Sequence, residues 1–290
     1  MKVTKAVIPA AGLGTRVLPA TKALPKEMFP IVDKPAIQYI VEEAVQSGIT
    51  DILIITNRGK ETIEDHFDKS PELEQRLLSN KNDKMYKEII DISKLANIYF
   101  LRQKETHGLG HAIGCARSFV GSDPFAVLYG DDVIISKEPV CAQLIKTYET
   151  YHKCVLGINK VSKNEITKYS SLKVENIKDN IFNCTDMIDK ASQEKIMSLY
   201  SILGRCILTP EIFDILDKTQ PGAGGEIQLT DALKTLATTT GVTAVDFIGK
   251  RYDMGNKLGI LKANVEVALS RDDLKDDFAE YLSSLNLLKV

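Results

Sequence analysis

A short apolar run that leads into a glycine loop constrains the fold of this chain more than any other feature. Residues 6–8 read Ala-Val-Ile, which is typical of a strand buried on both faces of a parallel sheet. Gly12 and Gly14 follow, and glycine lets the backbone adopt positive φ and approach a ligand closely. Because consecutive N–H groups in such a loop form a concavity that binds anions, this stretch predicts an anion site at the end of the first strand.

The residues after the glycines are rich in proline and carry a cluster of cations. Pro19 and Pro25 argue against a helix that begins directly after the glycines, so we expect a long, irregular loop. A loop of this kind in a compact domain is usually functional. Arg16, Lys22 and Lys26 supply positive charge, and together with the glycines they indicate a triphosphate site. The alternative is an ordinary strand-to-helix turn with solvated cations.

Two well-known glycine motifs do not match this loop. A dinucleotide-binding fingerprint requires a third glycine, but the spacing that begins with Gly12 and Gly14 continues to Val17. It also requires an acidic residue near the end of the second strand, where residues 56–58 read Thr-Asn-Arg. A Walker A loop requires Gly-Lys followed by Ser or Thr at the start of a helix, and that is absent. The pattern therefore disfavours a dinucleotide-dependent oxidoreductase.

Composition narrows the class of protein. A chain of 290 residues with 44% hydrophobic and 26% charged residues is long enough for one large α/β domain with an ample core. The net charge of −2 gives no general attraction to nucleic acid, and no apolar run approaches the ~18 residues of a transmembrane helix. No secretory signal peptide is visible. The scattered cysteines are typical of reduced thiols in a cytoplasmic protein: Cys115, Cys141, Cys154, Cys184 and Cys206.

Hydrophobic periodicity predicts alternating strands and helices, as in an α/β fold. Apolar residues at helical spacing follow Pro35, and Gly48 is a typical residue just beyond a helix end. We expect this helix to cross between parallel strands at 6–8 and 52–56. A further helix is expected at 110–119. The remaining expected elements are strands at 98–102, 125–129, 155–161 and 199–208, short strands at 172–174 and 181–182, and helices at 139–151, 211–218, 257–269 and 272–287.

Glycines and carboxylates follow two of the later strands, where a parallel sheet presents its ligand crevice. Gly108 and Gly110 come after the third expected strand and again permit close backbone approach. Asp131 and Asp132 come after the fourth. Mg²⁺ prefers one or two carboxylates together with substrate phosphates, so this position suits a metal ligand. The alternative is a simple turn, since Gly-Asp-Asp is also good turn chemistry.

The N-terminal loop resembles the signature of the sugar-nucleotide pyrophosphorylases. It matches in residues 12–16, Gly-x-Gly-Thr-Arg, in the two prolines and in Lys26. Glu27 resembles the residue found here in the uridylyl branch, the bacterial UTP–glucose-1-phosphate uridylyltransferases, whereas the thymidylyl branch usually has Gln. Residues 219–231 and 251–259 resemble two further motifs of the family. The resemblance extends over nearly all of the chain.

The resemblance implies an α/β, Rossmann-like nucleotidyltransferase fold, with a mostly parallel central sheet flanked by helices and a small β-rich sugar-binding lobe. One domain would span 1–290, with a nucleotide-binding half at about 1–161, the sugar-binding lobe and return strands at about 162–255, and C-terminal helices at 256–290. The implied reaction converts UTP and α-D-glucose 1-phosphate into UDP-glucose and pyrophosphate, with Mg²⁺ as cofactor. We expect a cytoplasmic homodimer or homotetramer that binds neither nucleic acid nor membrane, with the apolar stripe at 272–287 as a subunit contact.

The resemblance also implies roles for individual residues. Arg16 and Lys26 would neutralise the triphosphate and Lys190 would hold the sugar phosphate, which makes these three catalytic. Asp131 and Asp253 would bind the metal. The implied nucleotide-binding residues are Ala10, Ala11, Gly12, Gly14, Thr15, Glu27, Gln103 and Gly108, with Gln103 and Gly108 at the uracil edge. The implied sugar-binding residues are Asp132, Ser170, Asp189, Lys190 and Glu226, although Glu226 equally suits a stabilised helix start.

The chain departs from the family pattern on the sugar side. Asp189 replaces the usual Glu, Ala191 replaces the usual Pro, and Ser170 and Ser171 replace different residues. A carboxylate that is one methylene shorter cannot reach the same hydroxyl groups without movement. Two alternatives therefore stay open. One is the same chemistry with another sugar 1-phosphate or with dTTP, and the other is a weakly active regulator that binds UDP-sugars.

Overall fold

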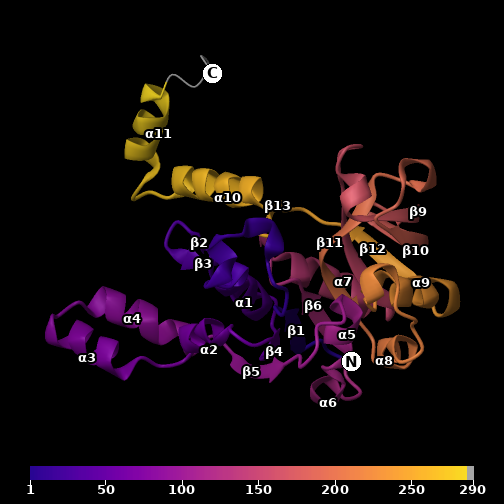
Figure 1. Ribbon diagram of the computed structural model, residues 1–290, viewed down its shortest axis with the longest axis horizontal. Coiled ribbons are helices and arrows are strands. Elements are labelled where there is room, and N and C mark those ends of the chain that lie inside the picture. Colours follow the sequence, from indigo (N-terminus) through magenta and orange to yellow (C-terminus); the bar gives the residue numbers. More distant parts are fainter. Residues whose placement is uncertain (286–290) are drawn as a thin grey trace.

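A mixed sheet of nine strands forms the centre of the molecule (Figure 1). The computed structural model describes residues 1–285. The strands are β1 (Lys5–Pro9), β4 (Asp51–Thr56), β5 (Asn97–Arg102), β6 (Phe125–Leu128), β8 (Cys154–Lys160), β9 (Ser170–Lys178), β10 (Ile181–Asp189), β11 (Tyr200–Leu208) and β12 (Val242–Asp246). Their order is β5-β4-β1-β6-β11-β8-β12-β10-β9. Two small sheets pair β2 (Pro30–Ile31) with β3 (Lys34–Pro35), and β7 (Asp132–Ile135) with β13 (Lys250–Asp253).

The strands nearest the glycine loop run parallel. β1 pairs in parallel with β4 on one side and with β6 on the other, and β4 pairs in parallel with β5. The carboxyl ends of these four strands therefore meet at one edge of the sheet, where ligands bind in open α/β folds. β11 runs antiparallel between β6 and β8, and the antiparallel hairpin β9–β10 forms the far edge. The α/β class expected from the sequence is confirmed.

Helices cover both faces of the sheet because alternate strand residues point into two separate cores. In β1, Ala6 and Ile8 belong to one core and Val7 to the other, and none of the three is exposed. The helices on the first face are α1 (Ala36–Gln46), α7 (Val140–Tyr151) and α10 (Lys257–Ser270). Those on the second face are α5 (Leu109–Gly114), α8 (Glu211–Leu216) and α9 (Leu229–Thr239).

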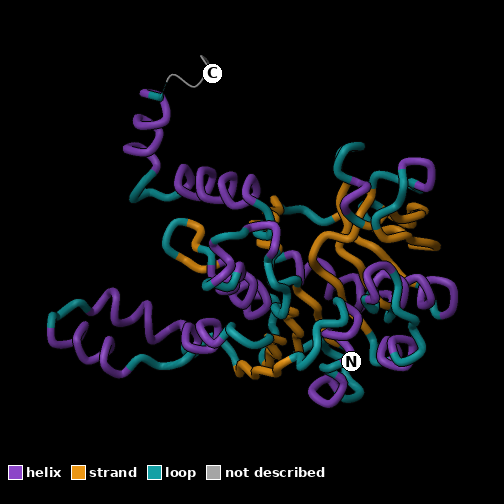
Figure 2. Tube along the Cα trace, in the orientation of Figure 1, coloured by secondary structure: helices purple, strands orange, loops and turns teal. Residues whose placement is uncertain are grey.

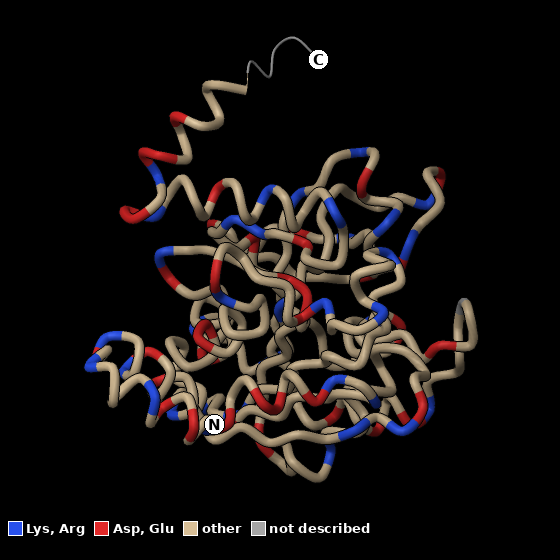
Figure 3. Tube along the Cα trace, turned by 60° about the vertical axis from the view of Figure 1, so that its left-hand side comes forward, with Lys and Arg blue, Asp and Glu red and all other residues tan. Residues whose placement is uncertain are grey.

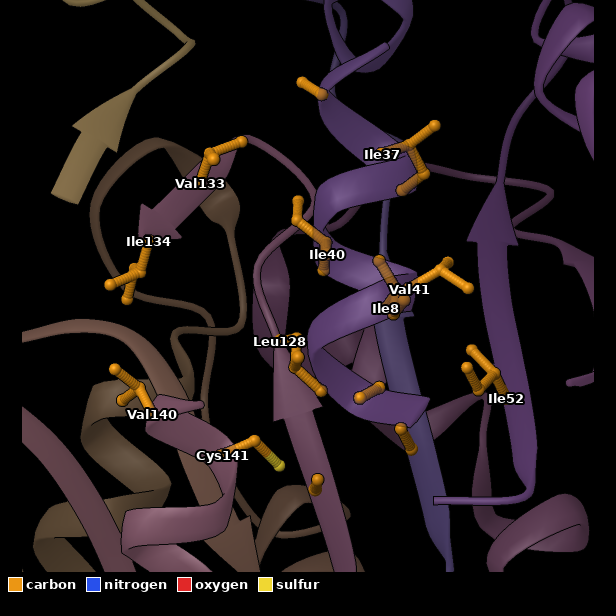
Figure 4. Packing of buried hydrophobic residues seen from close by; sticks show 14 of the residues in the cluster. Ile8, Ile37, Ile40, Val41, Ile52, Leu128, Val133, Ile134, Val140 and Cys141 are labelled. Carbon is orange, nitrogen blue, oxygen red and sulfur yellow. The ribbon is translucent and has the colours of Figure 1, made fainter. Parts of the chain in front are cut away.

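The helix α1 confirms the crossover that the sequence predicts. Its Ile37, Ile40 and Val41 have no exposed surface and pack over Ile8 of β1, as Figure 4 shows. Gly48 adopts φ +86° shortly after the helix ends, which is the left-handed conformation that glycine favours at this position. The chain then enters β4, which is parallel to β1, so strand, helix and strand form the expected unit.

Two expected elements differ in extent. The helix expected at 110–119 is split into α5 and α6 (Arg117–Val120), and α5 ends at Gly114, a residue with low helix propensity. The short strands expected at 172–174 and 181–182 belong to the long hairpin β9–β10. Its turn places Asp179 at φ +51°, a conformation that Asp tolerates better than most residues.

Two helical segments extend away from the sheet (Figures 1 and 2). One comprises α3 (Pro71–Ser79) and α4 (Asp83–Ile92), which follow the core-packed helix α2 (Glu61–Phe67), and the other is α11 (Lys275–Ser284), which follows α10. The sequence predicts the last helix over 272–287, of which 286–287 lie outside the described residues. No helix within 1–285 is both long and apolar enough to span a membrane. Acidic and basic residues are interspersed along the trace (Figure 3), so any strong charge at a ligand must come from a local cluster.

Candidate active site

A cleft of about 430 Å³ opens at the carboxyl ends of β1, β5 and β6. This is the edge of the sheet at which the loops after the parallel strands converge. The glycine loop, the segment after β5 and the turn after β6 all contribute to its wall, as the sequence predicts. The lining residues are Pro9, Ala11, Gly12, Leu13, Gly14, Thr15, Lys26, Gln103, Thr106, Gly108, Leu109, Ala112, Tyr129, Asp131 and Glu226.

The glycine loop is irregular, as its prolines predict. Three short 3₁₀ turns, η1 (Thr15–Val17), η2 (Ala20–Lys22) and η3 (Lys26–Met28), take the place of a continuous helix. Gly14 adopts φ +67°, and a Cβ on it would lie 2.9 Å from Thr21 Cγ2. Thr21 Oγ1 donates a hydrogen bond to the carbonyl oxygen of Gly14 at 2.8 Å. A side chain at Gly14 would therefore disturb the contact that folds the loop back on itself.

Two carboxylates and two cations form a compact cluster beside the loop. The β7–β13 pairing brings Asp253, at the end of β13, close to Asp131, which precedes β7. Lys26 Nζ forms an ion pair with Asp131 Oδ2. Arg16 lies 3.9 Å from Asp131 Oδ2 and 3.6 Å from Asp253 Oδ2. The structure thus brings together four residues that the sequence predicts for phosphate and metal binding.

Ion pairing outweighs burial within this cluster. Burial raises the pKa of a carboxyl group, but Lys26 and then Arg16 bring the pKa of Asp131 below its usual value. Burial likewise lowers the pKa of Lys26, yet Asp131 and Glu27 raise it above its usual value. Both members of the Lys26–Asp131 pair are therefore charged at neutral pH.

The geometry of the carboxylates suits a divalent cation shared with a phosphate. A Cβ built on Gly255 would lie 2.9 Å from Asp131 Oδ2 and 2.9 Å from Asp253 Oδ1, so both carboxylates border one position, which the Arg16 guanidinium also reaches. Within the described residues, no three His, Cys, Asp or Glu side chains converge on a common metal position. Two carboxylates with the other ligands left to phosphate and water is the arrangement that Mg²⁺ favours.

The opposite wall of the cleft carries the groups expected to read a nucleobase. The Gln103 side chain is largely buried, and its Nε2 donates a hydrogen bond to Nδ1 of His111 at 2.7 Å. Gly108 adopts φ +92°, and a Cβ on it would lie 2.8 Å from Glu226 Cβ. The backbone N–H of Ile227 donates to the carbonyl of residue 107 at 2.8 Å. This packing explains why residue 108 is a glycine. It also brings Glu226 to the cleft, although Glu226 is distant in sequence from the other lining residues.

Glu27 lies beneath the loop and does not line the cleft. Its side chain is 1% exposed, and Oε2 accepts a hydrogen bond from Lys60 Nζ at 2.8 Å. Burial raises the pKa of the Glu27 carboxyl, although Lys60 and Lys26 oppose this shift. Position within η3 explains the placement, because the turn directs Lys26 towards Asp131 and its neighbour Glu27 into the core. The structure therefore gives no direct contact between Glu27 and the nucleobase wall.

Two of the expected sugar-binding residues already form hydrogen bonds with other side chains or the backbone inside the protein. Asp132 is 3% exposed and its Oδ1 accepts hydrogen bonds from Arg251 Nε at 2.9 Å and, as an ion pair, from Nη2 at 2.6 Å. Ser170 is buried, and its Oγ lies 3.2 Å from Ser201 Oγ and accepts a hydrogen bond from the N–H of Ile202 at 3.1 Å. These contacts tie β7 to β13 and β9 to β11.

Asp189 and Lys190 stand at the end of β10. Lys190 adopts φ +45°, its Nζ lies 3.8 Å from Asp189 Oδ2, and its side chain is 66% exposed. Burial raises the pKa of the Asp189 carboxyl, Lys190 lowers it, and the nearby Asp231 and Glu226 raise it further. Asp189 and Glu226 are therefore electrostatic neighbours although they come from different parts of the chain.

The structure adds site residues that sequence reasoning missed. Arg251 secures Asp132 and lies 5.0 Å over the ring of Tyr169, whose hydroxyl donates to Asp253 Oδ2 at 3.2 Å. Lys60 lies between β4 and α2, and its ammonium pairs with the buried Glu27. An alternating pattern does link Arg251 with Asp253, since both lie on one face of β13. No pattern in the sequence around Lys60 indicates its contacts with Glu27 and Ala10.

The sequence model that describes nucleotidyl transferases matches residues 5–270. The chain belongs to the nucleotidyl transferase family. Members of this family generally use a divalent metal ion, which agrees with the paired carboxylates of Asp131 and Asp253 in this nucleotidyl transferase.

Named relatives of this nucleotidyl transferase match it over nearly its whole length. UTP–glucose-1-phosphate uridylyltransferase YngB of Bacillus subtilis is 49% identical over 284 residues, which are 98% of this chain and 96% of the relative. UTP–glucose-1-phosphate uridylyltransferase 1 of Staphylococcus saprophyticus is 46% identical over 286 residues, 99% of this chain and 100% of the relative.

Solved structures of similar proteins share the fold. A UDP-glucose pyrophosphorylase complexed with UDP-glucose superposes with a TM-score of 0.85 at 41% identity, covering 93% of this chain and 100% of the other. The UTP-bound UGPase from Acinetobacter baumannii superposes with a TM-score of 0.90 at 35% identity, covering 98% of this chain and 100% of the other. The resemblance inferred from the sequence motifs is thereby confirmed.

Proposed function

We propose that this nucleotidyl transferase converts UTP and α-D-glucose 1-phosphate into UDP-glucose and pyrophosphate. The observation that carries the proposal is that the glycine loop and the Lys26–Asp131 pair line one cleft, and that Arg16 and Asp253 adjoin Asp131 in the same cluster. Such a cleft joins backbone donors, cations and paired carboxylates, which is what transfer of a nucleotidyl group requires. Relatives that match over nearly the full length carry this activity in their names.

In the proposed reaction, a phosphate oxygen of the sugar attacks the α-phosphorus of UTP in line with the leaving pyrophosphate. One P–O bond forms at the α-phosphorus, and the bond to the bridging oxygen of pyrophosphate breaks. The attacking oxygen is already ionised at neutral pH, so the protein need not supply a general base. Its contribution is therefore positioning and stabilisation of charge.

In this proposal, the cations of the cluster bind the phosphate groups of UTP. Lys26 and Arg16 turn from the carboxylates to the triphosphate, and the backbone N–H groups of the glycine loop add neutral donors. We propose Mg²⁺ as the metal, held by Asp131 and Asp253. When bound, it neutralises charge on the phosphate oxygens and orients them. Lys190 holds the phosphate of the sugar, since its ammonium is exposed and only loosely paired with its neighbour.

We propose that the opposite wall of the cleft, which includes Gln103 and Gly108, recognises uracil. The base presents an N3–H donor between two carbonyl acceptors. Because Gln103 Nε2 donates to His111, its Oε1 remains as the acceptor for N3–H. The backbone around Gly108 can approach the base closely, since no side chain intervenes. On the sugar side, Asp132 and Ser170 are already paired within the protein, so we assign the sugar hydroxyl groups to Asp189 and Glu226.

The test measures pyrophosphate release with Mg²⁺ and UTP or dTTP, crossed with the 1-phosphates of glucose, galactose and N-acetylglucosamine. Fast release with UTP and glucose 1-phosphate alone is the expected result, and it shows that Asp189 does the work of the usual Glu. Fast release with another sugar would assign specificity to the departures around Asp189. Absence of release with every pair, despite tight UDP-glucose binding, would replace the enzyme with a sensor.

A matched pair of variants ties the activity to the proposed carboxylates. Asp131→Asn should reduce turnover by roughly 10²–10³, the usual cost of losing one aimed charge-stabilising group. Asp68→Asn makes the same chemical change at an exposed carboxylate outside the cleft and should leave turnover unchanged. Equal activity of the two variants would remove Asp131 from the site.

We also propose that copies of the chain associate as a dimer or a pair of dimers through the C-terminal helices. An apolar groove between α10 and α11 supports this, since its walls include Leu261, Leu274 and Phe278. Leu261 is 62% exposed, and an exposed apolar groove of this kind is a common site of protein–protein contact. Light scattering should report more than one chain per particle. Leu261→Glu should dissociate the assembly. Leu73→Glu, at an exposed leucine of α3 outside this groove, should not.

A further inference from the structure

We propose that Lys60 and Asn57 are positioning residues, which hold the glycine loop so that two of its backbone N–H groups face the cleft. The inference rests on the proposed function, because it concerns the loop that would bind UTP. Both residues lie in the short connection between β4 and α2, and neither lines the cleft. They act from beneath the loop, through its carbonyl oxygens.

The hydrogen bonds of these two side chains end on successive residues of the loop. Lys60 Nζ donates to the carbonyl oxygen of Ala10, and Asn57 Nδ2 donates to the carbonyl oxygen of Ala11. The Lys60 side chain is 6% exposed and Asn57 is 9% exposed, so water does not compete for these bonds. On the strand side, the N–H of Ala10 donates to the carbonyl of Ile55 at 2.8 Å. The start of the loop is therefore fixed on both sides.

The direction of these carbonyls determines the direction of the N–H groups that follow them. In a planar trans peptide, the C=O of one residue and the N–H of the next point in opposite directions. Since the carbonyls of Ala10 and Ala11 point to Lys60 and Asn57, the N–H groups of Ala11 and Gly12 point away from the core. Ala11 and Gly12 line the cleft, and neither N–H has an acceptor among the described residues. Two such donors side by side suit an oxygen of the nucleotide.

Glu27 takes part in this arrangement as the counter-charge of Lys60. Its Oε2 accepts from Lys60 Nζ at 2.8 Å in a region almost closed to solvent. A buried ammonium is tolerated only when it is paired and hydrogen-bonded, so Lys60 needs this carboxylate in order to reach Ala10. Glu27 also adjoins Lys26, whose ammonium rests on Asp131. One buried ion pair thus connects the base of the glycine loop with the segment that carries Lys26.

Two variants separate this positioning role from simple stabilisation. Lys60→Met combined with Glu27→Gln removes both charges together, so no uncompensated buried ion remains to unfold the protein. Asn57→Leu removes only the amide and replaces it with a side chain of similar size. Arg58→Met is the matched control, because Arg58 is an exposed cation between the two positions. Each variant is compared with the wild-type chain by calorimetric titration of UTP with Mg²⁺, by steady-state kinetics and by thermal unfolding.

In both test variants we expect the dissociation constant of UTP to rise roughly ten- to hundredfold, as for the loss of donors to a charged group. The KM for glucose 1-phosphate should stay unchanged, and amide hydrogen exchange at Ala10, whose N–H donates to Ile55, should accelerate in the folded protein. Arg58→Met should change none of these quantities.

Other outcomes overturn the inference in distinguishable ways. If the variants unfold at lower temperature but the folded protein binds UTP as tightly as wild type, Lys60 and Asn57 are structural only. If the wild-type chain itself binds no uridine nucleotide, the proposed function fails first, and the positioning role fails with it.

Discussion

The ammonium of Lys26 and the carboxylate of Asp131 form an ion pair, so a residue expected to bind phosphate rests on a residue expected to bind metal. Arg16 lies 3.6 Å from Asp253 in the same manner. Binding of a metal–triphosphate complex requires these pairs to exchange partners, with the carboxylates turning to the metal and the cations to the phosphates. Metal and nucleotide should therefore bind much better together than separately.

Lys26→Met should strengthen the binding of Mn²⁺ alone while it weakens the binding of UTP. Without the ammonium, Asp131 loses its competing cation, and the affinity for free Mn²⁺ should rise by roughly tenfold, a modest share of the attraction between charges in contact. Turnover should fall by roughly 10²–10³. Electron paramagnetic resonance of Mn²⁺ without nucleotide measures the first effect. Lys69→Met, at an exposed position outside the cleft, is the control, and equal Mn²⁺ affinity in both variants would contradict the exchange of partners.

Gly255→Ala should impair catalysis without unfolding the protein. Its Cβ would lie 2.9 Å from oxygens of both Asp131 and Asp253 and would also contact the Arg16 guanidinium. The methyl group would fill the position that both carboxylates reach, so Mn²⁺ affinity in the presence of UTP and turnover should both fall, by roughly 10² in the case of turnover. Gly114→Ala makes the same change where no atom lies within 4 Å, and it should keep full activity. Full activity of Gly255→Ala would show that catalysis does not depend on the space beside the two carboxylates.

Arg251→Met should destabilise the fold through Asp132. The Asp132 carboxylate is 3% exposed, and loss of its guanidinium partner leaves a buried charge unpaired. Removing one partner of a buried ion pair typically costs about 3–5 kcal/mol of unfolding free energy, which urea denaturation would measure. The double variant Arg251→Met with Asp132→Asn removes both charges and should recover much of this loss. If the single and double variants were equally unstable, the packing of Arg251 on Tyr169 would be the larger contribution.

The cysteine thiols should be almost unreactive in the folded protein. Burial raises the pKa of Cys141, Cys184 and Cys206 to about 12, and it also raises the pKa of Cys154. Since the thiolate is the reactive form, Ellman's reagent at pH 8 should label only the partly exposed Cys115 at a measurable rate. All the thiols should react after unfolding in guanidinium. Rapid labelling of a second thiol in the native protein would show that one of the buried sites opens readily.

The same thiols determine how stability changes at high pH. The folded state keeps their protons, whereas unfolded thiols release them above about pH 9, so the unfolded state binds fewer protons in this range. The free energy of unfolding should therefore be unaffected by these groups below pH 9 and should fall as pH rises from about 9 towards 12. Urea denaturation at pH 7.5, 9 and 10.5 checks the direction, and Cys206→Ala should reduce the slope.

Local patterns predicted most of the framework. The apolar run at 6–8, the stripe of α1 and the glycine after it are features of neighbouring residues, and each is found as expected. Asn256 likewise caps α10, with its Oδ1 accepting from the N–H of Gly259 at 2.7 Å. Lengths were less predictable, as in β9–β10, because pairing with a neighbouring strand extends an element beyond its own propensity.

The site was predictable in its residue types but less so in its contacts. Asp131 and Asp253 come together through the pairing of β7 with β13, which no local pattern in the sequence reveals. Glu27 stands next to Lys26 in sequence, yet a 3₁₀ turn sends the two side chains in different directions. The role of Lys60 depends on the pairing of β1 with β4, which brings its side chain beneath Ala10. The sequence around Lys60 does not reveal this pairing.

The strand β11 has a consequence for how substrates enter and products leave. It is hydrogen-bonded to β6 along one edge and to β8 along the other, so the nucleotide wall and the hairpin that bears Lys190 belong to one continuous sheet. Such a sheet has no hinge between its two halves, so the halves cannot move apart as rigid bodies. Entry and exit of ligands must therefore depend on surface loops such as the segment 220–228, while the sheet and the anchored start of the glycine loop keep their positions during turnover.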